Sequence, residues 1–105
     1  GDEATFAQVW EWRVEDQGTF VEEFNRMIEV WKPEGYLSLG GIFGGQSIEG
    51  ESHYIYTTYN TYEEMLSFGP KTPGEQKAFE DFIKNVDPIS EFKGTYSVVN
   101  VETWN

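Results

Sequence analysis

The stretch over residues 36–62, YLSLGGIFGGQSIEGESHYIYTTYNTY, decides how the rest of the chain can fold. Its two ends, residues 36–43 and 53–59, are rich in aromatic and β-branched side chains and predict two strands. The glycine-rich segment between them predicts a loop, since glycine accepts positive φ angles. Gly40 and Gly41 fall inside the first strand, where they predict a bulge or a close approach by another group. We therefore expect an edge hairpin, curved at these glycines.

A helix is predicted on the N-terminal side of this hairpin. Thr19 and Glu22 have the spacing of a capping box, which marks the start of a helix. The apolar residues that follow recur at helical spacing and form one stripe: Phe20, Phe24, Met27, Ile28 and Trp31. Pro33 and Gly35 are expected to end this helix.

Two helical segments are predicted on the C-terminal side. Asn60 or Thr61 can cap a short helix, and Thr61 with Glu64 again fits a capping box. A longer helix is predicted from about Gly74 to Val86, where apolar residues recur at helical spacing, and it ends before Pro88.

The two ends of the chain predict further strands. Residues 4–15 alternate with period two, with Trp10 and Trp12 on one face and Glu11 and Arg13 on the other. Residues 94–104 predict the last strand, and both Asn100 and Trp104 would then lie on one of its faces.

The order strand, helix, strand, strand, helix, strand is that of a ferredoxin-like domain. We expect one domain over residues 1–105, of the α+β class, with four antiparallel strands and both helices on one face. The other face would be a large apolar patch, so a homodimer, with a second copy covering the sheet, is expected.

Composition excludes several functions. The chain has 19 acidic and 7 basic residues, a net charge of -12, so its field disfavours nucleic acids and anionic membrane surfaces. It contains no cysteine, which excludes disulfides and thiolate metal sites. No apolar run is long enough to cross a bilayer, and we expect a soluble, cytoplasmic protein.

The hairpin leading into NTYEEM and the closing segment FKGTYSVVNVETW, together with the order of elements, resemble the dimeric α+β barrel superfamily. Within it, the small proteins related to antibiotic-biosynthesis monooxygenases are the most similar. The resemblance implies a dimer with a ligand cavity between each sheet and its helices. Some members of the family oxygenate aromatic substrates without metal or flavin, others degrade haem, and many have no known activity. Haem degradation is not expected, because residues 61–86 lack the histidine that the haem-degrading members use.

His53 is the candidate catalytic residue, since histidine exchanges protons near neutral pH. The alternative is a structural histidine beside the turn. No second histidine or carboxylate cluster stands at ligand spacing, so no metal site is expected. The resemblance to the cofactor-free oxygenases implies no cofactor.

Six residues are candidates for ligand binding: Trp10, Trp12, Arg13, Tyr54, Tyr56 and Asn100. The four aromatic ones lie on strands predicted to be neighbours, and they form either a pocket for a flat ligand or core and dimer packing. Arg13 either anchors an anionic or carbonyl-bearing ligand or pairs with Glu102 or with the partner subunit.

The sequence therefore predicts a homodimer that binds an aromatic or apolar molecule, with cofactor-free monooxygenation as its candidate activity. The alternative is a non-catalytic binding or assembly module of the same fold. An enzyme should have His53, Arg13 or Asn100 converging on an enclosed cavity. In a packing module these side chains should be engaged by apolar contacts or paired charges.

Overall fold

A computed structural model of the chain describes residues 6–32, 37–42 and 50–104. The predicted ends of the hairpin strands at Tyr36 and Phe43, most of the hairpin loop, and the helix stop at Pro33 and Gly35 lie outside these residues. The elements follow in the order β1 (Phe6–Val14), α1 (Gln17–Val30), β2 (Leu37–Gly41), β3 (His53–Tyr59), α2 (Tyr62–Leu66), α3 (Pro73–Val86), a 3-10 turn (Asp87–Ile89) and β4 (Ser90–Val99).

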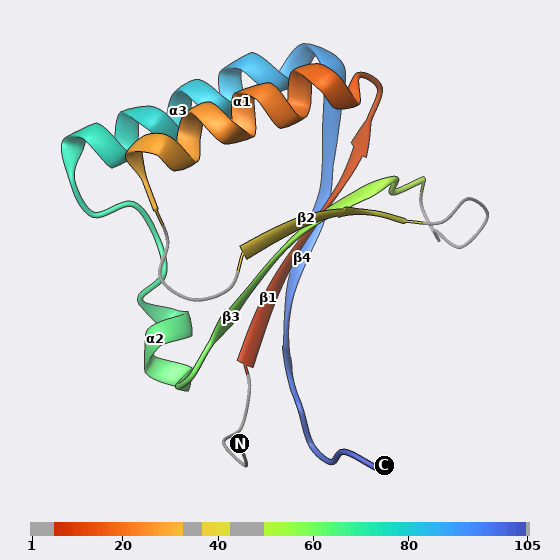
Figure 1. Ribbon diagram of the computed structural model, residues 1–105, viewed down its shortest axis with the longest axis vertical. Coiled ribbons are helices and arrows are strands. Elements are labelled where there is room, and N and C mark those ends of the chain that lie inside the picture. Colours follow the sequence, from red (N-terminus) through yellow and green to blue (C-terminus); the bar gives the residue numbers. More distant parts are fainter. Residues whose placement is uncertain (1–5, 33–36, 43–49, 105) are drawn as a thin grey trace.

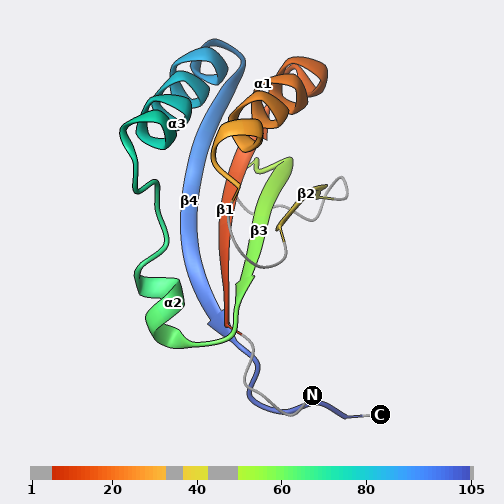
Figure 2. The same ribbon diagram turned by 60° about the vertical axis from the view of Figure 1, so that its left-hand side comes forward.

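The strands form one antiparallel sheet in the order β2-β3-β1-β4. Helices α1 and α3 lie side by side across one end of the sheet, and α2 lies near the opposite end of the strands (Figures 1 and 2). This is the ferredoxin-like α+β fold, and the predicted fold class is confirmed. The hairpin of β2 and β3 does lie at the edge, and β1 is an interior strand.

The start of α1 differs from the prediction. Asp16, and not Thr19, is the N-cap, because its Oδ1 accepts a hydrogen bond from the Thr19 backbone N–H at 3.1 Å. Its Oδ2 accepts a second one from the Thr19 hydroxyl at 2.7 Å. The two hydrogen bonds to Thr19 hold the pKa of Asp16 below its ordinary value. The predicted capping box at Thr19 was therefore wrong, since an acidic cap three residues earlier already satisfies the free backbone N–H groups.

Both α2 and α3 begin with a threonine cap whose hydroxyl accepts a hydrogen bond from the backbone N–H three residues later. Thr61 caps α2, as predicted, and its hydroxyl accepts from the Glu64 N–H at 3.1 Å. Thr72 caps α3 in a full capping box with Glu75, and Pro73 occupies the first turn. The longer helix is confirmed from Pro73 to Val86, and proline in the next turn prevents its continuation.

The last strand also differs from its predicted span of 94–104. It runs from Ser90 to Val99, and Asn100 lies beyond its end. Between the pairs Glu11–Gly94 and Trp12–Phe92 the register shifts by one residue, which is a β-bulge. Gly94 lies at this bulge with a φ of 153°, a value that favours glycine. It therefore stands inside the strand, whereas the prediction placed it at the start.

The paired glycines of β2 have a different role from a bulge. The β2–β3 register is continuous through Gly40 and Gly41, so the predicted bulge was wrong. The other predicted reason for glycine, a close approach, holds at Gly40. A β-carbon there would lie 2.5 Å from Cζ of Tyr54, whose ring therefore covers this glycine. At Gly41 the nearest atom to a β-carbon would be the Ser52 carbonyl oxygen, at 3.8 Å.

The core lies between the sheet and the two long helices. The predicted stripe of α1 faces it, with Phe20, Phe24 and Met27 buried, and α3 contributes Phe82 and Val86. Aromatic rings meet edge to face, as between Trp12 and Phe20, whose centroids lie 5.4 Å apart. No helix in the described ranges is long and apolar enough to cross a membrane.

Candidate functional site

A cavity of about 600 Å³ lies between the sheet and the helices. Its wall is formed by all four strands, α1, α3, the 3-10 turn and the α2–α3 connection. Eight of the described wall residues are aromatic: Trp10, Trp12, Phe24, Trp31, Phe68, Phe79, Phe82 and Phe92. Three of the four tryptophans of the sequence therefore line one space. Rings of this size bury large apolar areas, and a wall made of them suits a flat apolar molecule.

Phe68 connects the aromatic groups of this wall. It belongs to the α2–α3 connection, yet its ring centroid lies 5.5 Å from that of Trp10 on β1 and 5.2 Å from that of Trp31 after α1. Tyr59 at the end of β3 is a third neighbour, at 5.3 Å. One residue outside the helices and strands therefore ties two strands and the end of α1 together around the cavity.

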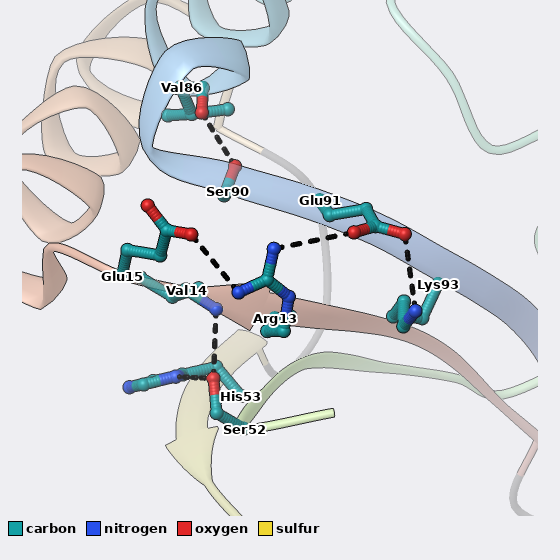
Figure 3. Close-up of polar contacts among 9 residues, drawn as sticks. All are labelled: Arg13, Val14, Glu15, Ser52, His53, Val86, Ser90, Glu91 and Lys93. Atoms are coloured by element: carbon teal, nitrogen blue, oxygen red, sulfur yellow. Dashed lines mark hydrogen bonds and ion pairs between the residues drawn. The ribbon is translucent and has the colours of Figure 1, made fainter. Parts of the chain in front are cut away.

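The hydroxyl groups of the wall have their protons engaged. Thr95 Oγ1 donates to the Val9 carbonyl at 2.7 Å and accepts from Gln8 Nε2 at 2.6 Å. Ser90 Oγ donates to the Val86 carbonyl at 2.6 Å (Figure 3). Since each hydroxyl carries one proton, both groups can only accept a further hydrogen bond.

A polar pocket of about 490 Å³, here called the side pocket, adjoins the cavity at Trp31, Phe68 and Gly69. Its wall includes Tyr59 and Lys71. Burial raises the pKa of Tyr59 to about 12. The Lys71 ammonium donates to the Ser67 carbonyl across the α2–α3 connection.

The six predicted ligand-binding residues do not come together. Trp10 and Trp12 face the helices and line the cavity. Tyr54 and Tyr56 lie on the adjacent strand, as predicted, but they are paired with Glu11 and Val9 and so occupy the opposite face of the sheet. Neighbouring strands place paired residues on one face, so strand adjacency alone could not bring all four rings into one pocket.

His53 is held by hydrogen bonds outside the cavity wall. Its Nδ1 lies 2.8 Å from Ser52 Oγ, and its Nε2 lies 2.7 Å from Gln17 Oε1 at the start of α1. Ser52 Oγ in turn accepts from the Val14 N–H at 2.8 Å (Figure 3). The histidine therefore links the start of β3 to the start of α1, which is the structural alternative that the sequence left open.

Arg13 pairs with charges on neighbouring segments and not with Glu102. Its guanidinium lies 3.0 Å from Glu15 and 3.4 Å from Glu91 on β4, and Glu91 also contacts Lys93 (Figure 3). Hydrogen bonds to Glu15 and Glu91 raise the pKa of Arg13. The predicted pairing with Glu102 was wrong, because the strand ends before that residue.

Asn100 is exposed, and its side chain donates to Thr103 Oγ1 at 3.1 Å. It lies beyond β4 and outside the cavity wall. None of His53, Arg13 and Asn100 converges on the cavity.

Sequence reasoning missed Phe68, Ser90 and Thr95. Thr95 lies inside the predicted span 94–104, but only the register of β4 against β1, in which it pairs with Trp10, places it beside the tryptophan. Phe68 lies in the segment FGP, which predicts only a loop. Over the described ranges, no cluster of three or more histidine, aspartate or glutamate side chains could hold a metal ion.

The opposite face of the sheet is partly apolar. Ala7 and Val9 form its buried floor on β1, next to Tyr96 and Val98, which are 48% and 43% exposed. Burial, and then a hydrogen bond to Glu11, raise the pKa of Tyr96. No helix of the described chain covers this face (Figure 2).

The fold has known counterparts among solved structures. A hydroxynitrile lyase from Passiflora edulis matches 100% of this chain and 100% of its own, with a TM-score of 0.60 and 13% identity. An ethyl tert-butyl ether (EthD) family protein from Bacillus halodurans matches 96% of this chain and 99% of its own (TM-score 0.54, 16% identity). A protein from Chloroflexus aurantiacus, described as a candidate antibiotic biosynthesis monooxygenase, matches 96% of this chain and 97% of its own (TM-score 0.52, 10% identity).

At these identities the likeness shows the fold. The predicted resemblance to antibiotic-biosynthesis-monooxygenase-like proteins is thereby confirmed at that level. No protein-family model and no curated protein sequence matches the chain.

Proposed function

We propose that this protein binds a small apolar or aromatic molecule in the cavity between its sheet and helices. The observation that carries the proposal is the aromatic wall around about 600 Å³ of space. Protein interiors pack closely and contain few voids larger than a water molecule. Pockets for small molecules span roughly 300–1,000 Å³ and are mostly apolar. A space of this size and lining therefore fits a ligand better than it fits a packing defect.

Isothermal titration calorimetry with naphthalen-2-ylmethanol, a neutral aromatic probe, tests this proposal. Ile83 lines the cavity and is 39% exposed, so Ile83→Trp adds bulk at the wall of the cavity without opening the core. Val30→Trp makes the same kind of change at an exposed site on α1 that is outside the cavity wall. We expect saturable binding that Ile83→Trp weakens and Val30→Trp preserves. Absence of binding to the wild-type protein would reject the proposal.

We also propose that the protein is a homodimer in which the open sheet face meets a second copy. Tyr96 and Val98 add exposed apolar area to the floor formed by Ala7 and Val9. A second copy of the same face would remove this area from water and would supply equal apolar area in return. Light scattering should give twice the mass of the chain.

The matched variants for the dimer are Val98→Asp and Val101→Asp. Val101 is 90% exposed and lies beyond β4, so a carboxylate there should leave the dimer intact. At Val98 the carboxylate would have to be buried at the interface, and the dimer should dissociate. A monomeric wild-type protein at micromolar concentration would refute this part of the proposal.

Cofactor-free monooxygenation is the second candidate function, because the fold also occurs in enzymes. Of the described residues on the cavity wall, Asp87 is the one with an acidic or basic side chain, and the wall contains no histidine. This favours binding without catalysis. Oxygen consumption across quinols and polyphenols, measured for wild type and His53→Ala, separates the two functions. Equal consumption in both would remove His53 from the mechanism, and no consumption would leave the binding module.

A further inference from the structure

We infer that the cavity selects an apolar ligand that carries a protonated amine. This inference rests on the proposed binding function and concerns the charge of the ligand. It follows from which hydrogen-bonding groups and charges the wall can present to an occupant.

The hydroxyl and carboxylate side chains on the wall can accept hydrogen bonds but not donate them. Thr95 and Ser90 give their hydroxyl protons to the carbonyls of Val9 and Val86. The Asp87 side chain, the charged group of the wall, accepts when ionised. A ligand that donates hydrogen bonds matches all three groups, whereas a carboxylate or carbonyl matches none of them.

The remaining side-chain donors among the described wall residues are the indole N–H groups of Trp10, Trp12 and Trp31. The Trp12 indole N–H is buried within the protein, out of contact with water, and has no hydrogen-bond partner among the described residues. The Trp12 N–H therefore cannot reach an occupant of the cavity. The other two indole N–H groups carry no formal charge, so Asp87 remains the one charged group that the described wall presents.

Aromatic faces and the overall charge favour a cation further. An ammonium group over the face of a tryptophan is attracted by the ring quadrupole, and Trp10 and Trp31 both line the cavity beside Phe68. No lysine, arginine or histidine belongs to the described part of the wall. The net charge of -12 also raises the local concentration of cations around the molecule.

The side pocket suggests the opposite charge. Lys32 and Lys71 line it, so a ligand that extends past Phe68 could place an anion there. The Lys71 ammonium already donates to the Ser67 carbonyl. Glu64 and Glu75 stand in the same wall and offset both lysines. The side pocket therefore gives an anion no net charge to pair with.

Three probes with one ring system test the inference by calorimetry at low salt: naphthalen-2-ylmethylammonium, naphthalen-2-ylmethanol and 2-naphthoate. We expect the ammonium to bind about tenfold more tightly than the alcohol, and the naphthoate to bind most weakly. Added salt should reduce the preference of the ammonium over the naphthoate, since part of it arises from the field of the whole molecule.

Two variants locate the effect. Asp87→Asn should weaken binding of the ammonium probe and leave binding of the alcohol unchanged, whereas Thr95→Val should weaken binding of both probes. Asp81→Asn makes the same charge change on α3 outside the wall, and it should alter neither probe by more than about twofold.

The outcomes separate the two proposals. Equal affinity for the three probes, or tightest binding of the naphthoate, overturns the inference while small-molecule binding stands. An ammonium preference that Asp87→Asn and Asp81→Asn reduce equally also overturns it, because the preference would then belong to the overall charge. Failure of all three probes to bind rejects the proposed function and this inference with it.

Discussion

The ring of Phe68, in the connection between α2 and α3, lies 5.5 Å from the ring of Trp10 in the interior strand β1. These residues are far apart in the sequence, and neither lies in the long helices that form most of the core. Both residues line the cavity, and Phe68 belongs to the connection that runs from α2, near one end of the strands, to α3 at the other (Figure 1). The α2–α3 connection is therefore part of the site as well as a link between helices.

Phe68→Ala should destabilise the protein and weaken ligand binding. The half-buried ring contacts Trp10, Trp31 and Tyr59, so its removal should lower the free energy of unfolding by about 2 kcal/mol. Urea denaturation measures this. Leu66→Ala, at a residue that is 65% exposed, is the control and should change stability little. Equal effects of the two variants would show that the contacts of Phe68 contribute no stability.

The substitutions Gly40→Ala and Gly41→Ala should change the free energy of unfolding in opposite directions. The new methyl group at Gly40 displaces the ring of Tyr54, and we expect a loss of about 1 kcal/mol. At Gly41 the methyl group meets only the Ser52 carbonyl oxygen, in ordinary van der Waals contact at 3.8 Å, and the loss of backbone freedom in the unfolded chain should stabilise the protein by about 0.5 kcal/mol. Thermal unfolding of both variants checks this. A stabilising Gly40→Ala would mean that Tyr54 moves aside at no cost.

Protonation of the Asp16 cap should lower the free energy of unfolding at acidic pH. Because hydrogen bonds from Thr19 lower the pKa of Asp16 in the folded state, its contribution is fully present above the unfolded pKa. It is lost as the pH falls through the folded pKa. Asp16→Asn keeps a capping side chain but cannot titrate, so its stability should fall less between about pH 5 and about pH 2. Identical pH profiles of the two proteins would contradict this role for the Asp16 carboxylate.

Ionisation of Tyr59 should lower the free energy of unfolding at alkaline pH. Burial raises its pKa to about 12, so the folded state keeps the phenol neutral where the unfolded chain already ionises it. Its contribution is present below the unfolded pKa of about 10 and is lost as the pH rises through the folded pKa. Tyr59→Phe should flatten the fall in unfolding free energy above about pH 10, measured by denaturation. Unchanged slopes would mean that Tyr59 ionises equally in both states.

Much of the fold could be predicted because each element carries its own signal. The apolar stripe of α1, the alternation of β1 and the Thr61 cap depend on neighbours in the sequence, and all three are confirmed. The start of α1 was misplaced because Asp16 and Thr19 are both good caps, and only the folded geometry selects between them. The start of β4 was misplaced because its bulge puts glycine inside the strand.

The candidate site was harder to predict because it depends on faces and distant contacts. Trp10 and Trp12 were identified, but Tyr54 and Tyr56 lie across the sheet from them. Period-two alternation separates the faces of one strand, yet it does not show which face of the next strand shares the pocket. Phe68 gave no signal, since its position follows from the path of the α2–α3 connection.

The indole N–H signals of the four tryptophans in a ¹H–¹⁵N NMR titration with naphthalen-2-ylmethanol test the central claim most directly. Trp10, Trp12 and Trp31 line the cavity, whereas Trp104 is 84% exposed beyond β4 and serves as an internal control. We predict that the three cavity signals shift together and saturate while that of Trp104 stays in place. Cavity signals that do not move, or a shift confined to Trp104, would contradict binding between the sheet and the helices.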